Sequence, residues 1–172
     1  MTVPTIHPST AEHPEYHGHY IAQVPQGNIL DILQQGLDTT LALLGGASAR
    51  ADFRYAPDKW SLKEVVGHVI DTERIFAYRT LRFARNDKTP LSGFEQDDYM
   101  PYANFAGREL SDLAREFDCV RQATLFLLRN LDAAAWERRG TASGGEFTVR
   151  AMAYVIAGHE IHHRRIIEAK YL

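Results

Sequence analysis

The feature that most constrains this fold is the recurrence of apolar residues at three- and four-residue steps in four long segments. Such spacing gathers apolar side chains on one face of a helix. Breaks rich in glycine or proline separate the segments, and no convincing alternating strand lies between them. The helices are expected at about 26–44, 61–86, 111–131 and from 148 toward the C-terminus. We therefore predict an all-α fold, a four-helix bundle with either up-and-down or crossover connections.

The chain length fits one domain with a substantial core, because 172 residues lie near the usual domain size. Residues 1–25 are rich in proline, histidine, threonine and tyrosine and show no helical period, so an extended N-terminal arm is expected before a bundle domain at 26–172. The arm contains four histidines, which are His7, His13, His17 and His19. Their irregular spacing beside prolines gives no fixed geometry for a metal.

Composition excludes several partners. The formal net charge of −3 leaves no basic field of the kind that nucleic-acid binding requires. No apolar run has the length of a membrane span, and no membrane partner is expected. The single cysteine, Cys119, cannot form an internal disulfide, so a cytoplasmic location is expected. Because no other cysteine or histidine is near it in sequence, Cys119 is interpreted as a buried structural thiol.

Polar residues mark where two of the helices begin. Ser61 is followed three residues later by Glu64, which is the pattern of a capping box. Ser111 is the expected cap of the third helix. The helix that follows Ser61 carries apolar residues around more than one face, so it is expected to pack on two sides and to favour a symmetric homodimer.

A pair of histidines in the last helix carries the strongest chemical signal. His159 and His163 are four residues apart, so on a helix they lie one above the other and two imidazoles can share one ion. His162 is rotated by about 100° from His163, and we exclude it from the site. Glu160 is adjacent to His159 but is expected to point away from it.

The third candidate ligand is His68, whose neighbours in the second helix indicate a buried position where an imidazole needs a partner. A backbone carbonyl or a carboxylate is the alternative partner. Glu64 and Asp71 share the general face of His68 and could orient it or a bound water, although the capping box already accounts for Glu64. Arg164 and Arg165 are expected on a solvated face near the helix end, with recognition of an anionic substrate as the alternative.

Four segments in this order resemble the DinB/YfiT-like superfamily: KWSLKEVVGHVIDTERIFAYRTLRFARN, PLSGFEQDDYMPYANF, LDAAAWERRG and HEIHHRRII. The resemblance covers nearly all of the chain after the arm. It implies a four-helix bundle that often dimerises and that binds one divalent metal, commonly zinc or nickel. The ligands it implies are His68, His159 and His163, and Trp60 precedes Ser61 as the family pattern requires.

The resemblance extends to bacillithiol- and mycothiol-dependent transferases. Three protein ligands leave a position for water or substrate, as in catalytic zinc sites. A metal-dependent enzyme is therefore expected, with thiol-dependent S-transfer ahead of hydrolysis and, for S-transfer, a low-molecular-weight thiol as cofactor. The alternative is a non-catalytic, stress-associated dimeric module that binds metal. An accessible polar pocket at the metal favours the enzyme, and a metal sealed by side chains favours the module.

The connection at 89–108 is longer than a usual turn between helices. It contains four aromatic residues, which are Phe94, Tyr99, Tyr102 and Phe105. They are expected either to fill a satellite core under the crossover or to form a lid over a substrate.

Overall fold

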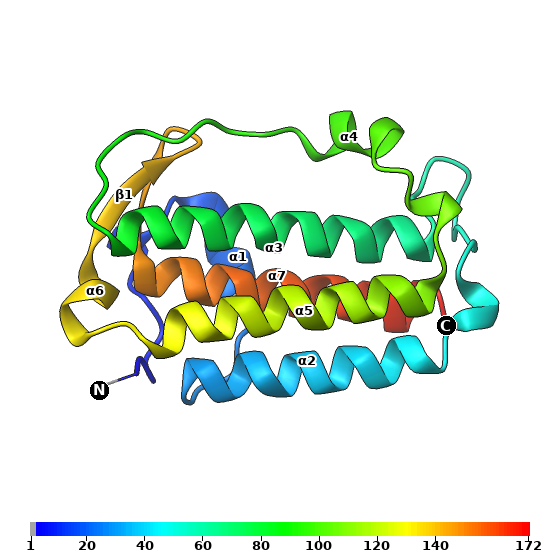
Figure 1. Cartoon of the computed structure of the whole chain (residues 1–172), viewed down its shortest axis with the longest axis horizontal. Helices are drawn as coiled ribbons and strands as arrows, with labels where there is room; N and C mark the ends of the chain where they lie inside the picture. Colours follow the sequence, from blue (N-terminus) through cyan, green and yellow to red (C-terminus); the bar gives the residue numbers. More distant parts are fainter. Residues whose placement is uncertain (1–2) are drawn as a thin grey trace.

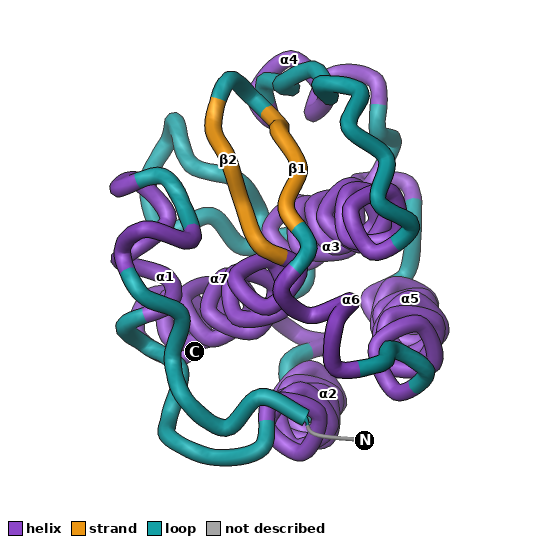
Figure 2. The backbone as a smooth tube through the Cα atoms, turned by 90° about the vertical axis from the view of Figure 1, so that its left-hand side faces the viewer, coloured by secondary structure: helices purple, strands orange, loops and turns teal. Residues whose placement is uncertain are grey.

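The computed structural model describes residues 3–172 and places four long helices side by side (Figure 1). They are α2 (Ile29–Gly45), α3 (Leu62–Ala84), α5 (Leu110–Arg129) and α7 (Val149–Lys170). Both α2 and α3 pack against α5 and α7, so α2 and α3 lie diagonally although they are consecutive in the chain (Figure 2). The predicted all-α four-helix bundle is confirmed, and its connections are of the crossover kind.

Polar side chains cap the N-termini of α3 and α7. The Ser61 side chain accepts a hydrogen bond from the Glu64 amide, and the Glu64 carboxylate accepts one from the Ser61 amide. The predicted capping box is therefore confirmed, and it satisfies amides that α3 leaves without partners. Thr148 caps α7 by accepting a hydrogen bond from the Ala151 amide.

Two predictions for the third helix are wrong. α5 begins at Leu110 with Glu109 at its cap, so Ser111 lies inside the first turn and does not cap the helix. Cys119 is exposed rather than buried. It follows the buried Phe117 by two residues, and a helix turns by about 200° over two residues, which places the thiol on the opposite face.

Shorter elements fill the connections. They are α1 (Gly18–Ile21), α4 (Gln96–Tyr99), α6 (Ala133–Glu137), β1 (Arg139–Ala142) and β2 (Gly145–Thr148). The antiparallel hairpin of β1 and β2 was not expected, since its glycines indicated only a break. Its turn uses Ser143 and Gly144, both with positive φ angles of 51° and 76°, as a tight two-residue hairpin requires.

The N-terminal arm is not extended over residues 10–21, and this prediction is wrong. Turns of 3₁₀ helix at Thr10–Glu12 and Glu15–His17 lead into α1, which packs on α7. The approach is close because Gly158 of α7 has no side chain: a Cβ there would lie 2.1 Å from the Tyr20 carbonyl oxygen. The domain boundary near residue 25 stays a prediction.

The long connection between α3 and α5 docks on the hairpin at one end and on α3 at the other. The Leu91 amide donates to the Thr141 carbonyl, and the Ser143 amide donates to the Leu91 carbonyl. Phe105 is buried, and it fits against α3 because Gly67 leaves room for its ring. Phe105 thus matches the satellite-core interpretation.

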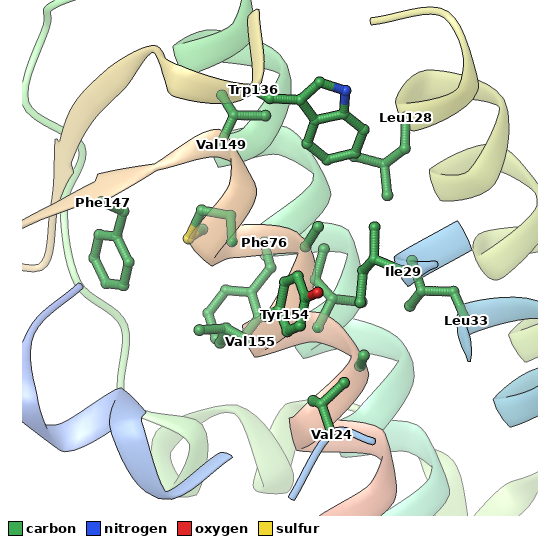
Figure 3. Close-up of a cluster of buried hydrophobic side chains, with 14 of the residues drawn as sticks. Val24, Ile29, Leu33, Phe76, Leu128, Trp136, Phe147, Val149, Tyr154 and Val155 are labelled. Carbon is green, nitrogen blue, oxygen red and sulfur yellow. The ribbon is translucent and has the colours of Figure 1, made fainter. Parts of the chain in front are cut away.

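The buried apolar side chains form two clusters along the bundle. One surrounds Tyr154 and Trp136 near the hairpin, where α7, α3 and α2 meet (Figure 3). The other surrounds Phe117 and Leu62 toward the opposite end. Among residues 3–172, no helix has the length and apolar character to cross a membrane.

Candidate metal centre

Three histidine side chains from two neighbouring helices meet in the bundle interior. His68 comes from α3, and His159 and His163 come from successive turns of α7. One ring nitrogen of each lies within 4.8 Å of the others, and the Nε2 atoms of His68 and His159 are 3.1 Å apart. The sequence therefore predicted correctly which three histidines come together, while their binding of a metal stays a prediction.

The donor set fits a transition metal. Two nitrogen ligands about 2.0–2.1 Å from one tetrahedral ion lie about 3.3 Å apart, which is close to the 3.1 Å between His68 and His159. His68 is 3% exposed and His159 is 5% exposed, whereas His163 is partly exposed. Imidazoles gathered in this way suit zinc or nickel better than magnesium or calcium, which prefer oxygen ligands.

The three imidazoles are neutral in the metal-free protein. Burial lowers the pKa of His68 to about 4. Burial, followed by the proximity of His68 and His162, lowers the pKa of His163 to about 3. Burial also holds the pKa of His159 well below its usual value, with His163 and His68 adding to the effect. A neutral imidazole is the form that coordinates a metal, so no proton has to leave at neutral pH.

A hydroxyl group holds the ring of His68. The Thr72 Oγ1 atom lies 3.4 Å from the His68 Nδ1 atom, one helical turn along α3. When His68 Nε2 is free to bind an ion, its Nδ1 carries the hydrogen and donates to Thr72. Such a bond fixes the tautomer and the ring orientation of a metal-binding histidine. The Trp60 ring packs against the His68 ring, with the two centroids 5.0 Å apart.

Neither of the carboxylates considered as partners of His68 takes that role. Glu64 belongs to the capping box and pairs with Arg54 at 2.7 Å. Asp71 lies toward the surface beside Arg74, 3.5 Å away. Thr72 takes the position beside His68 for which Glu64 and Asp71 were considered.

His162 and Glu160 lie outside the cluster, as predicted. The His162 ring turns toward the arm, where its Nδ1 atom lies 3.4 Å from the Gln23 side-chain nitrogen. Glu160 points away from the histidines and accepts hydrogen bonds from the Thr40 hydroxyl and from Arg164. The expectation of a solvated Arg164 is therefore wrong, because the side chain neutralises a buried carboxylate.

A cavity of about 550 Å³ leads to His68 and His159. Five parts of the chain form its walls: the arm, α3, the long connection, the hairpin and, through His159, α7. The arm contributes Tyr16, His17 and Tyr20, with the Tyr20 ring centroid 5.3 Å from that of His159. The long connection contributes Phe94 and the three residues that follow it. This segment therefore covers the site as well as filling a satellite core.

Part of this cavity could have been recognised in the sequence. The residues of α3 that line it with His68 are Thr72, Phe76 and Arg79, at steps of four, four and three residues. That spacing keeps all four on one helical face. The arm gave no such signal, because its contribution depends on how the chain folds back onto α7.

Comparisons with known proteins agree with this architecture. The model of the DinB superfamily matches residues 32–167. A solved structure with a TM-score of 0.64 covers 97% of this chain and 94% of its own, at 16% identity. It is YfiT from Bacillus subtilis, described as a probable metal-dependent hydrolase with an unusual four-helix bundle topology. A search of the curated proteins found no match. Because the family model spans most of its length, the chain belongs to the DinB superfamily.

Proposed function

We propose that this protein is a metal-dependent enzyme that binds one divalent transition metal, zinc or nickel, through His68, His159 and His163. The observation that carries the proposal is the cavity of about 550 Å³ that reaches His68 and His159. A metal-binding module without catalysis has no need of such an opening. A metal site sealed by side chains would have favoured that module instead. Cavities of this size with a few polar groups are typical of small-molecule sites.

When bound, the ion supplies a Lewis acid that polarises a substrate group or lowers the pKa of a water or a thiol. The residues of the chain prepare the site for that chemistry. Thr72 orients His68, and the packing of Trp60 on the same ring limits its rotation. Tyr20 of the arm and Phe94 of the long connection place aromatic rings in the cavity wall, and apolar walls strengthen electrostatic interactions beside them.

We propose thiol-dependent S-transfer as the first reaction and hydrolysis as the second. The carboxylates nearest in sequence to the ligands, Asp71, Glu64 and Glu160, are each paired with an arginine, which is Arg74, Arg54 and Arg164 respectively. A general base beside the metal is therefore lacking among these groups, and a thiol whose pKa the ion lowers needs none. Hydrolysis remains a candidate because YfiT, which has the same fold, is described as a probable metal-dependent hydrolase.

Metal binding is tested by elemental analysis of the purified protein. About one zinc or nickel ion per chain is expected, and the His163→Ala variant is expected to lose it because two ligands hold a metal far more weakly than three. His162→Ala is the matched control, since this neighbouring imidazole turns toward Gln23. A protein that takes up neither metal at neutral pH, or equal losses in both variants, contradicts the proposal.

The reaction is tested by offering the metal-loaded protein a panel of low-molecular-weight thiols with an electrophile, and in parallel a panel of esters and amides. Thiol-dependent consumption of the electrophile that disappears in His163→Ala supports S-transfer. Cleavage of an ester or amide without thiol supports hydrolysis. Metal-loaded protein inactive toward both panels favours the non-catalytic module.

A symmetric homodimer is also proposed, on the family resemblance alone. The wide apolar surface of α3, which suggested a dimer, is covered within the chain by Phe105 and by the neighbouring helices. Sedimentation at micromolar concentration measures the assembly directly, and a monomer there contradicts the proposal.

A further inference from the structure

An arginine without a carboxylate partner lies in the wall of the cavity. Arg79 of α3 is 3% exposed. Its Nη2 atom donates to the Ser92 carbonyl at 2.8 Å and to the Ser143 hydroxyl at 3.0 Å. Within residues 3–172, no carboxylate lies within ion-pair distance of Arg79, and Nε and Nη1 make no hydrogen bond. Burying a guanidinium without a countercharge is costly, so the position calls for an explanation.

The guanidinium is held in a fixed orientation. Its central carbon lies 5.7 Å from the ring centroid of Phe76 and 5.7 Å from that of Phe94, so aromatic rings contact it from α3 and from the long connection. Both contacts are within the range of cation–π attraction. Gly93 lies close to Ser143, since a Cβ there would be 3.4 Å from the Ser143 hydroxyl that accepts from Arg79. The fork is therefore positioned before any ligand binds.

Arg79 and the histidine cluster face the same cavity. His68 is the first residue of α3 to line it and Arg79 is the last. They are eleven residues apart, which corresponds to about 16 Å along the helix axis and to nearly the same face. A small molecule in the cavity can therefore meet the metal ligands at one end and a guanidinium at the other.

We propose that Arg79 binds an anionic group, a carboxylate or a phosphate, of the substrate whose reactive part lies at the histidine cluster. Arginine presents its N–H groups in a planar fork that matches these anions. The placement of the reactive part rests on the proposed function, whereas anion binding at Arg79 does not require a metal. Glu95 and Asp97 also line the cavity but are exposed, so their negative charges oppose a second anionic group near the opening.

The test measures binding of phenylacetate, benzylphosphonate and the neutral phenylacetamide to the full-length protein by calorimetry, with and without bound zinc. Without zinc, the better of the two anions is expected to bind about 10- to 100-fold more tightly than the amide, as for a hydrogen bond to a charged group. The ranking of carboxylate and phosphonate identifies the anion class. Equal affinities for anions and amide, or no binding of either anion, overturn the proposal.

Variants locate the effect. Arg79→Gln is expected to abolish the preference for the anion, and Arg85→Gln, which removes the same charge from the exposed end of the same helix, is expected to keep it. A preference that persists in Arg79→Gln, or that falls equally in both, overturns the proposal. If Arg79→Gln does not fold, Arg79→Lys keeps the charge but loses the fork, and its preference is expected to fall several-fold. If the protein binds the anion but takes up no zinc, the proposed metal site is refuted and anion binding at Arg79 is still supported.

Discussion

Two buried arginines on neighbouring helices differ in how their charge is met. Arg121 of α5 is fully buried and donates from Nε and Nη2 to the two oxygens of Glu73, both at 2.8 Å, while its Nη1 donates to the Leu33 carbonyl at 2.8 Å. Arg79 of α3 is almost as buried but engages the protein through one nitrogen and faces a cavity. Burial alone therefore does not define a role. A guanidinium with all its nitrogens bonded belongs to the scaffold, and one with free donors can bind a ligand.

The largest expected effect tests the scaffold arginine. Replacing Glu73 by alanine leaves Arg121 charged and buried without its partner, and removal of one member of a buried pair typically costs about 3–5 kcal/mol. The free energy of unfolding of Glu73→Ala should fall by about that amount in a denaturant titration. Arg79→Gln should lose less, because it breaks hydrogen bonds from one nitrogen and no ion pair.

Asp112→Ala is the control for the Glu73 experiment. Asp112 also pairs with an arginine, Arg108, but at the surface, where an ion pair is typically worth about 1 kcal/mol or less. If Glu73→Ala were no more destabilising than Asp112→Ala, or if Arg79→Gln were as destabilising as Glu73→Ala, the distinction between the two arginines would fail.

The next largest expected effect is a loss of stability of the metal-free protein at acid pH. In the metal-free protein, burial holds the pKa of His68 at about 4 and that of His163 at about 3, whereas an unfolded histidine titrates near 6.5. Between these values the unfolded chain binds more protons than the folded one, so stability falls as the pH is lowered from about 6.5 toward 4. Unfolding midpoints of the metal-free protein at pH 7.5 and pH 5 should show this loss.

The matched control for the acid experiment is His68→Gln, which removes one of the depressed groups and should reduce the pH dependence. A chelator at pH 7.5 should leave the helical circular dichroism signal intact, because the core clusters do not depend on the ion. A collapse of the signal on chelation would make the ion a structural staple rather than a reactive centre.

His68 and Arg79, which lie toward opposite ends of α3, show how far the sequence could predict the site. His159 and His163 were recognised because helical spacing alone brings them together, and His68 was recognised from its buried neighbours in the second helix and then from the family resemblance. The capping box at Ser61 was equally local. Arg79 shares a helical face with His68, yet its free charge depends on which chain segments cover it, and that is a long-range property.

The errors at the hairpin and the arm involve contacts between distant segments and, in the arm, an overlooked local pattern. The hairpin at 139–148 was missed because its strands are short and glycine-rich, so that its pairing with Leu91 rather than its composition stabilises it. The arm was expected to be extended because it lacks a periodic apolar pattern. Its first turn begins with a capping box, in which Glu12 accepts hydrogen bonds from the amide and the hydroxyl of Ser9, and this local pattern was overlooked. Glu12 also accepts hydrogen bonds from Arg150 across the chain, and such long-range pairing cannot be inferred from neighbouring residues.

The smallest expected effect tests whether the arm, like Arg79, serves the cavity rather than the scaffold. Glu12 accepts hydrogen bonds from Arg150 at 2.6 and 2.9 Å and from Thr148 at 3.1 Å. Burial opposes ionisation of this carboxyl, but the hydrogen bonds from Arg150 and from Ser9 together outweigh it and lower the pKa of Glu12. Glu12→Gln should therefore cost about 1–2 kcal/mol of the free energy of unfolding, as expected for hydrogen bonds to a charged group.

Which part of the molecule Glu12→Gln loosens is more informative than the size of the lost stability. Because Tyr16 and Tyr20 line the cavity, loosening the Glu12 anchor should speed amide hydrogen exchange at 10–21 and weaken phenylacetate binding several-fold, while zinc occupancy stays near one per chain. Glu15→Gln is the control, since Glu15 is exposed and its replacement should change stability by less than about 0.5 kcal/mol. Loss of zinc together with the anion in Glu12→Gln would mean that the arm supports the metal centre itself. Unchanged exchange and binding would mean that the arm is held by its apolar contacts with α7, and that Glu12 does not control access to the cavity.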